Sequence, residues 1–375
     1  MPRTTLLVSI LAALLLLGAC GPAGGGTAYG EDDVSQAVTD VTADLADLAT
    51  SFQDDLGVDA LAGFPGPLPG SMSAVTLNAN GLSLASAYPS QATSLLRGIW
   101  EWDDGVSLDW VKVGDSSNLE MRWPFLDATA TERNAKLVVD WGVTDQVRDG
   151  GGALVEVPTA MNVTMTVGTI TVADVDAEFD WYSSAACAEG ILEPDRVSVD
   201  GSFGVTATLV LDAITFEITP AAGANVQMAF SGETVASANG DRAGLDWTVT
   251  VMGPLARGTN CYTESFEPES GTVDVLLSSE QAGVTSSLGL SLSFENLDMS
   301  GPTGASVDLD GELSVDGAAA VSFSGTLNDK DGNGIPGDNL VLVFKNGDTT
   351  TLETFIESQL EATATTAIRV LSLFR

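Results

Sequence analysis

Apolar and polar residues alternate almost without interruption from about residue 154 onward. In the first run, Met161, Val163, Met165 and Val167 would share one face of a strand, with Asn and Thr between them. A period of two indicates strands that bury one face and expose the other. Similar runs follow at 197–211, 245–251, 288–294, 307–315 and 321–323. Because Thr, Ser and Asp fill the alternate positions, we expect a large antiparallel sheet covered on one side.

Asn-Gly and Asp-Gly pairs punctuate these runs. Both pairs favour the left-handed backbone of a two-residue hairpin turn. We therefore predict tight turns at 80–81, 239–240, 316–317 and 346–347, and a further turn at 103–105.

Helical spacing replaces the alternation near both ends of the chain. Over residues 31–60 an apolar stripe recurs every three or four positions. The stripe fits either a coiled-coil helix that binds a partner or an amphipathic helix packed on its own domain, and its short length favours the second. A second helix is predicted over 349–375, where Thr350 and Glu353 match a capping box. The first stripe consists of Val34, Val38, Val41, Leu45, Leu48 and Phe52.

The predicted fold class is therefore mainly β. We expect a large antiparallel meander, as a curved sheet, sandwich or half-barrel, flanked by an N-terminal and a C-terminal amphipathic helix. A Pro/Gly linker at 61–71 separates the first helix from a β domain at 72–348, and a subdivision near residue 158 stays open.

The first residues carry a localisation signal. Leu6–Leu17 is an apolar run of the length of a secretory signal and is too short to span a membrane. Leu17-Gly18-Ala19-Cys20 then resembles the lipobox of bacterial lipoproteins. This resemblance implies removal of residues 1–19 and lipidation of Cys20, including a palmitate-type acyl chain. Residues 20–30 would be a flexible tether, and the protein would lie in the cell envelope, anchored to a membrane and facing the periplasm or the exterior.

Composition excludes several partners and mechanisms. The formal net charge of −38, with only Lys112, Lys136, Lys330 and Lys345 as lysines, argues against a nucleic-acid partner. Charged residues are 18% and apolar residues 44%, which indicates a folded acidic protein rather than a disordered one. The chain has no histidine, which excludes Ser-His-Asp and Cys-His catalysis and every histidine metal site.

Two cysteines remain once Cys20 is assigned to lipid. Cys187 and Cys261 form an even pair in a compartment that oxidises thiols, so we predict a disulfide between them. The alternative is two separate buried thiols.

Residues 329–338 read Asp-Lys-Asp-Gly-Asn-Gly-Ile-Pro-Gly-Asp and resemble the calcium loops of EF-hand, dockerin and β-propeller proteins. Calcium prefers six or more oxygen ligands, which alternating Asp and Asn in a tight turn supply. The sequence departs from these patterns at Gly337 and Leu340, where those loops have acidic ligands. The alternative is a hairpin loop without an ion. The candidate ligands are Asp329, Asp331, Asn333, the Ile335 carbonyl and Asp338, in a structural role.

Trp100-Glu101-Trp102 places two indoles on one face of a predicted strand. Exposed, they would form a sugar-binding platform; buried, they would be core, which is the interpretation that we favour. Paired carboxylates for glycoside hydrolysis cannot be singled out among 52 acidic residues.

Three hypotheses for function follow. The leading one is a non-catalytic lipid-anchored envelope protein, structural or protein-binding, with a β domain stiffened by calcium. The second is a carrier of lipid or another hydrophobic ligand on the apolar face of the sheet. The third is a carboxylate-dependent enzyme acting on envelope polysaccharide.

Overall fold

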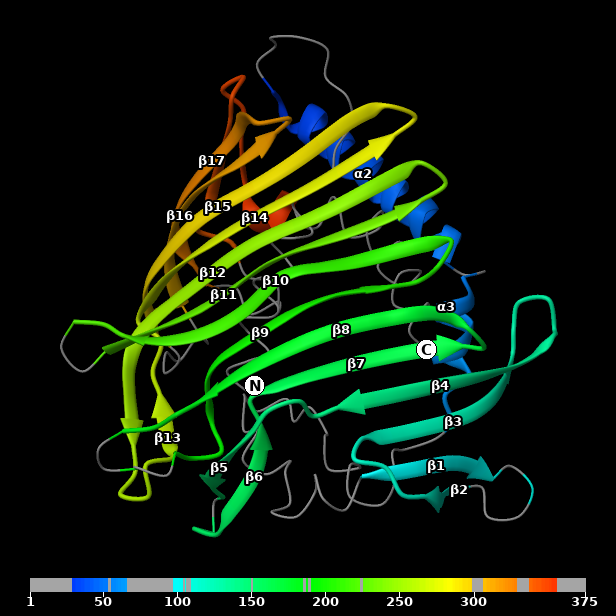
Figure 1. The fold of residues 1–375 in the computed structure, drawn as a ribbon. Helices are drawn as coiled ribbons and strands as arrows, with labels where there is room; N and C mark the ends of the chain where they lie inside the picture. The colour runs from blue at the N-terminus through cyan, green and yellow to red at the C-terminus, as the bar shows by residue number, and fades with distance from the viewer. Residues whose placement is uncertain are drawn as a thin grey trace. The chain divides into compact units, whose positions relative to one another are not determined.

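The computed structural model describes residues 29–52, 55–65, 97–103, 105, 109–149, 151–184, 187, 190–222, 225–298, 306–328 and 337–355. Strands dominate this part of the chain and form a large, mostly antiparallel sheet that does not close (Figure 1). The mainly β prediction is therefore confirmed.

Two helices begin the described chain, α2 (Glu31–Phe52) and α3 (Leu56–Ala62). The strands are β1 (Gly98–Asp103), β2 (Asp109–Gly114), β3 (Leu119–Leu126), β4 (Glu132–Asp140), β5 (Thr144–Arg148), β6 (Leu154–Pro158), β7 (Ala160–Val167), β8 (Ile170–Trp181), β9 (Pro194–Phe203), β10 (Ala207–Pro220), β11 (Asn225–Ala238), β12 (Asp241–Arg257), β13 (Thr263–Phe266), β14 (Ser270–Gln281), β15 (Val284–Asp298), β16 (Ser306–Val315), β17 (Ala318–Leu327), β18 (Val341–Phe344) and β19 (Thr349–Thr351).

The chain divides into two compact units. Unit 1 comprises Met1–Thr50, Pro220–Pro254 and Glu267–Arg375, and unit 2 comprises Ser51–Thr219 and Leu255–Phe266. The boundaries fall at these positions rather than near residue 158.

Unit 1 is an antiparallel meander in which β11, β12, β14, β15, β16, β17, β18 and β19 pair in that order. Its apolar face carries Leu, Val and Phe, and the opposite face carries mainly Ser, Thr and Asp. Helix α2 packs on the apolar face: Val34 and Val41 are fully buried, and Ser279 Oγ donates to Asp44 Oδ2 over 2.8 Å. This alternation is what the sequence predicted for this part of the chain.

The hairpin turns of unit 1 follow the predicted positions. Asn239-Gly240 joins β11 to β12 with φ of 55° and 92°, and Asp316-Gly317 joins β16 to β17 with φ of 49° and 74°. Asn346-Gly347 joins β18 to β19. The predicted turns there are confirmed, whereas the turn at 80–81 lies outside the described residues.

Near the end of the described chain, the helix begins at a different residue from the one predicted. Thr350 belongs to β19, and helical backbone begins at Leu352. The Thr351 hydroxyl accepts the Thr354 N–H over 3.2 Å, so Thr351 rather than Thr350 caps this turn. The predicted helix beyond residue 355 lies outside the described residues.

Unit 2 pairs its strands in the order β2, β1, β3, β4, β7, β8, β9 and β10. The β1–β3 pair is parallel and the others are antiparallel. The hairpin β5–β6 forms a small separate sheet. The core is aromatic: Trp123 lies 5.0 Å from Phe64 and 6.3 Å from Trp110 between ring centroids.

Asp55 divides the span predicted as one helix, 31–60, into α2 and α3. It has an extended backbone, and its Oδ1 accepts the Gly57 N–H, which makes it the N-cap of α3. Its Oδ2 accepts the backbone N–H groups of Val205, Thr206 and Ala207 over 2.7 to 3.2 Å. Burial opposes the charge, but these backbone donors outweigh it and lower the pKa of Asp55. This buried carboxylate fixes α3 to the β9–β10 connection.

Candidate functional site

The polar face of unit 1 presents side chains in straight rows across neighbouring strands. Antiparallel pairing aligns residues directly opposite one another, so equivalent positions on five or six strands line up. Row 1 contains Thr248, Asp274, Ser291, Glu312, Ser322 and Val343. Row 2 contains Thr250, Thr272, Ser293, Asp310, Ser324 and Val341.

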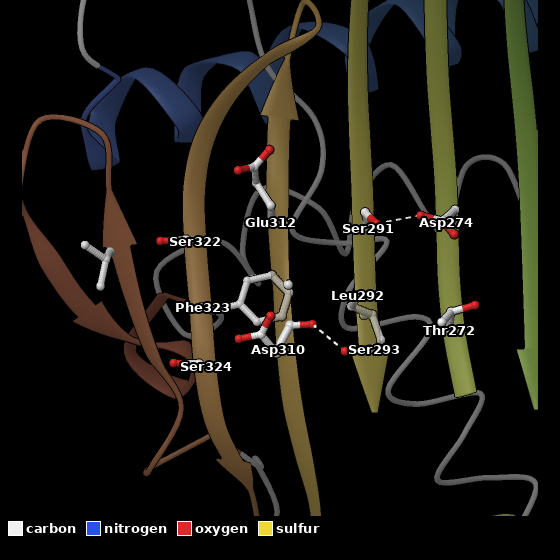
Figure 2. A pocket seen from close by; sticks show the side chains of 12 residues that line it. Thr272, Asp274, Ser291, Leu292, Ser293, Asp310, Glu312, Ser322, Phe323 and Ser324 are labelled. Atoms are coloured by element: carbon white, nitrogen blue, oxygen red, sulfur yellow. Dashed lines mark hydrogen bonds between the residues drawn. The ribbon is translucent and has the colours of Figure 1, made fainter. Parts of the chain in front are cut away.

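A groove of about 600 Å³ follows the middle of these rows. It is open to solvent, and its sides come from β14 to β18 (Figure 2). The lining side chains that face it are Thr272, Asp274, Ser291, Ser293, Asp310, Glu312, Ser322, Ser324 and Val343.

Gly311 lies beneath the groove and alternates with Asp310 and Glu312, so its missing Cβ would point to the apolar face. A Cβ at this position would lie 2.6 Å from both Phe323 Cζ and the Ser291 carbonyl oxygen, so no larger residue fits without displacement. Phe323 and Leu292 belong to the apolar face and pack against Gly311 there, while both also border the groove. The Gly311 backbone therefore lies at the floor of the groove, with an apolar layer beneath it.

The three carboxylates of the groove have different surroundings. Asp274 accepts a hydrogen bond from Ser291 Oγ over 2.6 Å. Asp310 and Glu312 are exposed, and their carboxylates have no hydrogen-bond or ion-pair partner among the described residues. In Figure 2 both side chains rise from β16 between the serines of the neighbouring strands. The carboxylates of Asp310 and Glu312 are therefore available to solvent or to a ligand.

The neighbouring row shows that such carboxylates need not stay unpaired. Asp308 accepts from Asn296 Nδ2 over 2.9 Å and from Thr326 Oγ1 over 2.7 Å. These two hydrogen bonds lower the pKa of Asp308. Asp308 therefore stabilises the sheet by bonding to the two neighbouring strands. Among the described residues, the Asp310 and Glu312 carboxylates form no such bonds.

Positive charge is scarce around the groove. In the described part of unit 1 the basic side chains are Arg242 and Lys345, and neither lines it. Arg242 lies 3.9 Å from Glu233. The groove is therefore a negative surface without a cation of its own.

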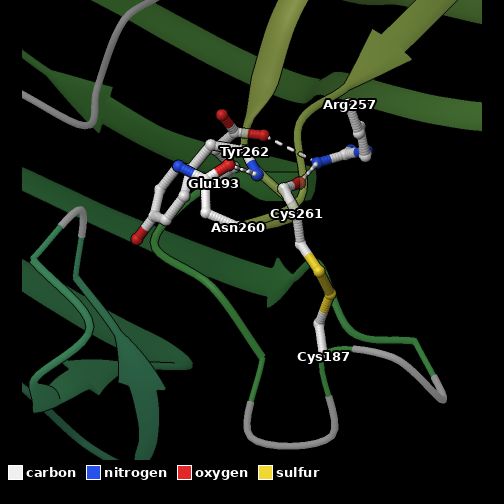
Figure 3. Close-up of a disulfide and its surroundings, with 6 residues drawn as sticks. All are labelled: Cys187, Glu193, Arg257, Asn260, Cys261 and Tyr262. Carbon is white, nitrogen blue, oxygen red and sulfur yellow. Dashed lines mark hydrogen bonds and ion pairs between the residues drawn. A yellow bond between two sulfur atoms is a disulfide. The ribbon is translucent and has the colours of Figure 1, made fainter.

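A second cluster lies in unit 2 around a disulfide. Cys187 and Cys261 are bonded across 74 residues, which confirms the predicted pair (Figure 3). Arg257 lies 3.5 Å above the Tyr182 ring and 2.7 Å from Glu193 Oε2. Glu193 also accepts the N–H and hydroxyl of Thr263, each over 2.9 Å.

Asp195 adds a titratable group to this cluster. Burial, opposed by Arg257 at 3.7 Å, raises the pKa of Asp195 to about 6. The other members pair with one another: Tyr262 donates to the Arg148 carbonyl over 2.5 Å, and Arg257 donates to the Cys261 carbonyl over 3.1 Å. We interpret the cluster as a structural clamp, because its charges satisfy each other.

The remaining predicted sites have different outcomes. Cys20 and residues 329–336, with the candidate ligands Asp329, Asp331, Asn333 and Ile335, lie outside the described residues. Asp338 is described, next to Gly337 with φ of 134°. Among the described side chains no group of three could hold a metal ion, so calcium stays a prediction.

The tryptophans have the packing that the sequence analysis favoured. Trp102 pairs with Trp110 across β1 and β2, with ring centroids 5.6 Å apart. Trp100 and Trp102 are half-buried against the core of unit 2. Glu101 on the same strand pairs with Arg122 at 3.2 Å.

The groove was not singled out from the sequence. Its residues come from five strands, and only the pairing register brings them together. The signal available in the sequence was the unusual polar face, with Ser, Thr and Asp but almost no Lys.

Comparisons with known proteins gave no relative: no family model matches the chain, and neither a curated protein nor a solved structure matches it significantly. Among the helices of the described part, none has the length and hydropathy needed to cross a membrane.

Proposed function

We propose that this is a lipid-anchored, non-catalytic protein of the cell envelope that binds another protein through the polar face of unit 1. The observation that carries the proposal is the groove, in which two carboxylates on a central strand of a long antiparallel sheet have no hydrogen-bond or ion-pair partner among the described residues. A sheet paired on both sides of that strand fixes the backbone positions from which these side chains extend. Exposed polar groups at regular backbone positions favour recognition of a surface or an extended segment.

The resemblance to the lipobox supports the anchor. Lipidation of Cys20 and the flexible tether at 20–30 would hold the β units near a membrane and leave the polar face accessible. Within this proposal, the flanking amphipathic helices cover the apolar face of the sheet. Calcium at 329–338 would stiffen the connection between β17 and β18.

A carrier of hydrophobic ligands is supported less well by the described residues. An apolar pocket lies between α2 and the sheet, lined by Val34, Leu290, Leu313 and Phe355 among others. Its volume is about 10 Å³, which holds one water molecule and not an acyl chain. The groove on the other face is polar, unlike the mainly apolar pockets that take small ligands.

The test uses the full-length protein in its host. A photo-cross-linking amino acid replaces Ser293 in the groove, and Thr285, exposed on the same face of β15 about 27 Å away, is the matched control. We expect a discrete protein adduct from position 293 and none from position 285. A Cys20→Ala variant should leave the membrane fraction.

Two results would overturn the proposal. One is a full-length protein that gives no adduct at either position and carries extractable lipid after purification, which would favour the carrier. The other is membrane association unchanged by Cys20→Ala, which would remove the anchor.

A further inference from the structure

We infer that the groove of unit 1 binds an extended, Lys/Arg-rich segment of a partner protein, lying along β16 with basic side chains at alternate positions. The inference rests on the proposed function and names the chemistry of the partner. It follows from three features of the groove: charge, spacing and shape.

The charge of the groove favours a cationic occupant. Asp274, Asp310 and Glu312 line one groove, and no described lysine or arginine faces them. Two of these carboxylates have no partner within the described part of the protein. An anionic ligand would be repelled, and a neutral one would gain no attraction from these charges.

The spacing favours an extended peptide. Asp310 and Glu312 lie two residues apart on one strand, so their attachment points are about 6.8 Å apart. Alternate side chains of an extended peptide have this same separation. A peptide that runs along β16 with Lys or Arg at every second position would therefore place successive cations opposite Asp310 and Glu312.

The shape supports the same orientation. The strands on either side of β16 carry only small side chains in rows 1 and 2: Ser291 and Ser293 on β15, and Ser322 and Ser324 on β17. These hydroxyls leave room for a chain above Gly311 and supply donors and acceptors for its backbone amides. A metal ion fits less well, because the described carboxylates do not converge in a group of three.

The experiment uses the full-length protein in detergent and a synthetic ten-residue peptide of alternating Lys and Ser. The groove variant is Asp310→Asn with Glu312→Gln. The control variant is Glu267→Gln with Glu280→Gln, which removes the same charge from exposed positions of unit 1. Glu280 lies about 20 Å along β14 from Asp274. Binding is measured by fluorescence anisotropy at low and high NaCl.

We expect the groove variant to bind the peptide about three- to tenfold more weakly than wild type, and the control variant to match wild type. A peptide of equal charge with lysines in adjacent pairs should bind about threefold more weakly than the alternating one. Affinity should fall as NaCl screens the charges.

Equal binding by wild type and both variants would overturn the inference, because it would show attraction by net charge alone. Equal binding of the two peptides would overturn the alternating spacing. If neither peptide binds while position 293 still cross-links a protein in cells, the partner is not basic and the proposed function survives. If both measurements are negative, both proposals fail.

Discussion

The two units use their acidic residues in different ways. In unit 2 the acids are part of the structure: Glu193 and Asp195 face Arg257, Asp127 pairs with Arg133 at 2.9 Å, and Asp55 is buried under backbone donors. In unit 1 the described acids meet few cations, and Asp310 and Glu312 meet none. A similar acidic composition therefore stabilises one unit internally and leaves charge available on the other.

The cores of the two units also differ in what stabilises them. Unit 2 is closed by aromatic contacts, a disulfide and specific ion pairs, whereas unit 1 depends on layers of Leu, Val and Phe under α2. Apolar layers tolerate changes in surface charge, because their stability comes from buried area. Unit 1 can therefore present a charged groove at a small cost in stability, and we expect the two units to respond differently to perturbation.

The largest difference should follow removal of the disulfide. Cys187 and Cys261 both belong to unit 2, but the 74-residue loop between them includes Pro220–Pro254 of unit 1. Cys187→Ala with Cys261→Ala opens this loop, which costs about 4 kcal/mol in the chain-entropy model. Hydrogen exchange followed by mass spectrometry should show faster exchange in β8, β9 and β13 and unchanged exchange in β15 and β16. Equal loss of protection in both units would show that they unfold as one.

The next effect should come from Asp55. Replacement by Ala removes the acceptor of the buried N–H groups of Gly57 and Ala207 and of the part-buried N–H groups of Val205 and Thr206, at a cost of about 3 kcal/mol. Asp59→Ala on the same helix is the control, because Asp59 accepts one exposed backbone bond from Ala128. Urea unfolding monitored by tryptophan fluorescence measures both variants.

The pH dependence of this effect has a definite sign. The pKa of Asp55 is lowered from 3.8 on folding, so the wild-type advantage is present above that value. It is lost as the pH falls through the lowered pKa of the folded state. The stability difference between wild type and Asp55→Ala should therefore be constant near neutral pH and shrink below pH 3.8. A difference that grows in acid would contradict this role.

Asp55 also shows where prediction from the sequence ends. Alternation predicted the strands because each residue's side of the sheet is a local property, and Asn-Gly and Asp-Gly predicted turns because backbone preference is local. The donors to Asp55 Oδ2 lie 150 to 152 residues away, and no local pattern indicates them. The Ala282-Gly283 turn between β14 and β15 was missed for a related reason: Ala282 adopts φ of 50° although alanine has no preference for it.

The groove could be predicted from the sequence only in part. The alternating runs predicted which face the polar residues of β15 and β16 share, since this depends on a period of two. No predicted run included Thr272 and Asp274 of β14. The sequence did not predict rows 1 and 2, because these require the register of several strand pairs at once. The parallel pairing of β1 with β3 and the position of Gly311 above Phe323 likewise depend on tertiary structure.

A smaller effect, opposite in sign to that of Asp55, is expected from Asp195 in the clamp of unit 2. Its pKa rises from 3.8 to about 6 on folding, so stability falls as the pH rises through this window. Asp195→Asn removes the penalty at pH 7 and should stabilise unit 2 by about 1 kcal/mol, after allowance for solvent screening and the lost pair with Arg257. Below pH 3.8 the variant and wild type should be equally stable. Destabilisation at pH 7 would show that the pair with Arg257 outweighs burial.

The smallest effect distinguishes the two units by salt. In unit 1 Asp310 and Glu312 have no cation among the described residues, so NaCl between about 20 and 500 mM should screen the repulsion between acidic side chains and slow hydrogen exchange. In unit 2 the same salt weakens pairs such as Arg257–Glu193 and Arg133–Asp127, so exchange there should accelerate slightly. Each shift should be a few tenths of a kcal/mol, because exposed charge interactions are weak. Choline chloride should reproduce both, since screening does not depend on the cation. A slowing that requires sodium, or one shared equally by both units, would show that the charge difference between the units does not govern their stability.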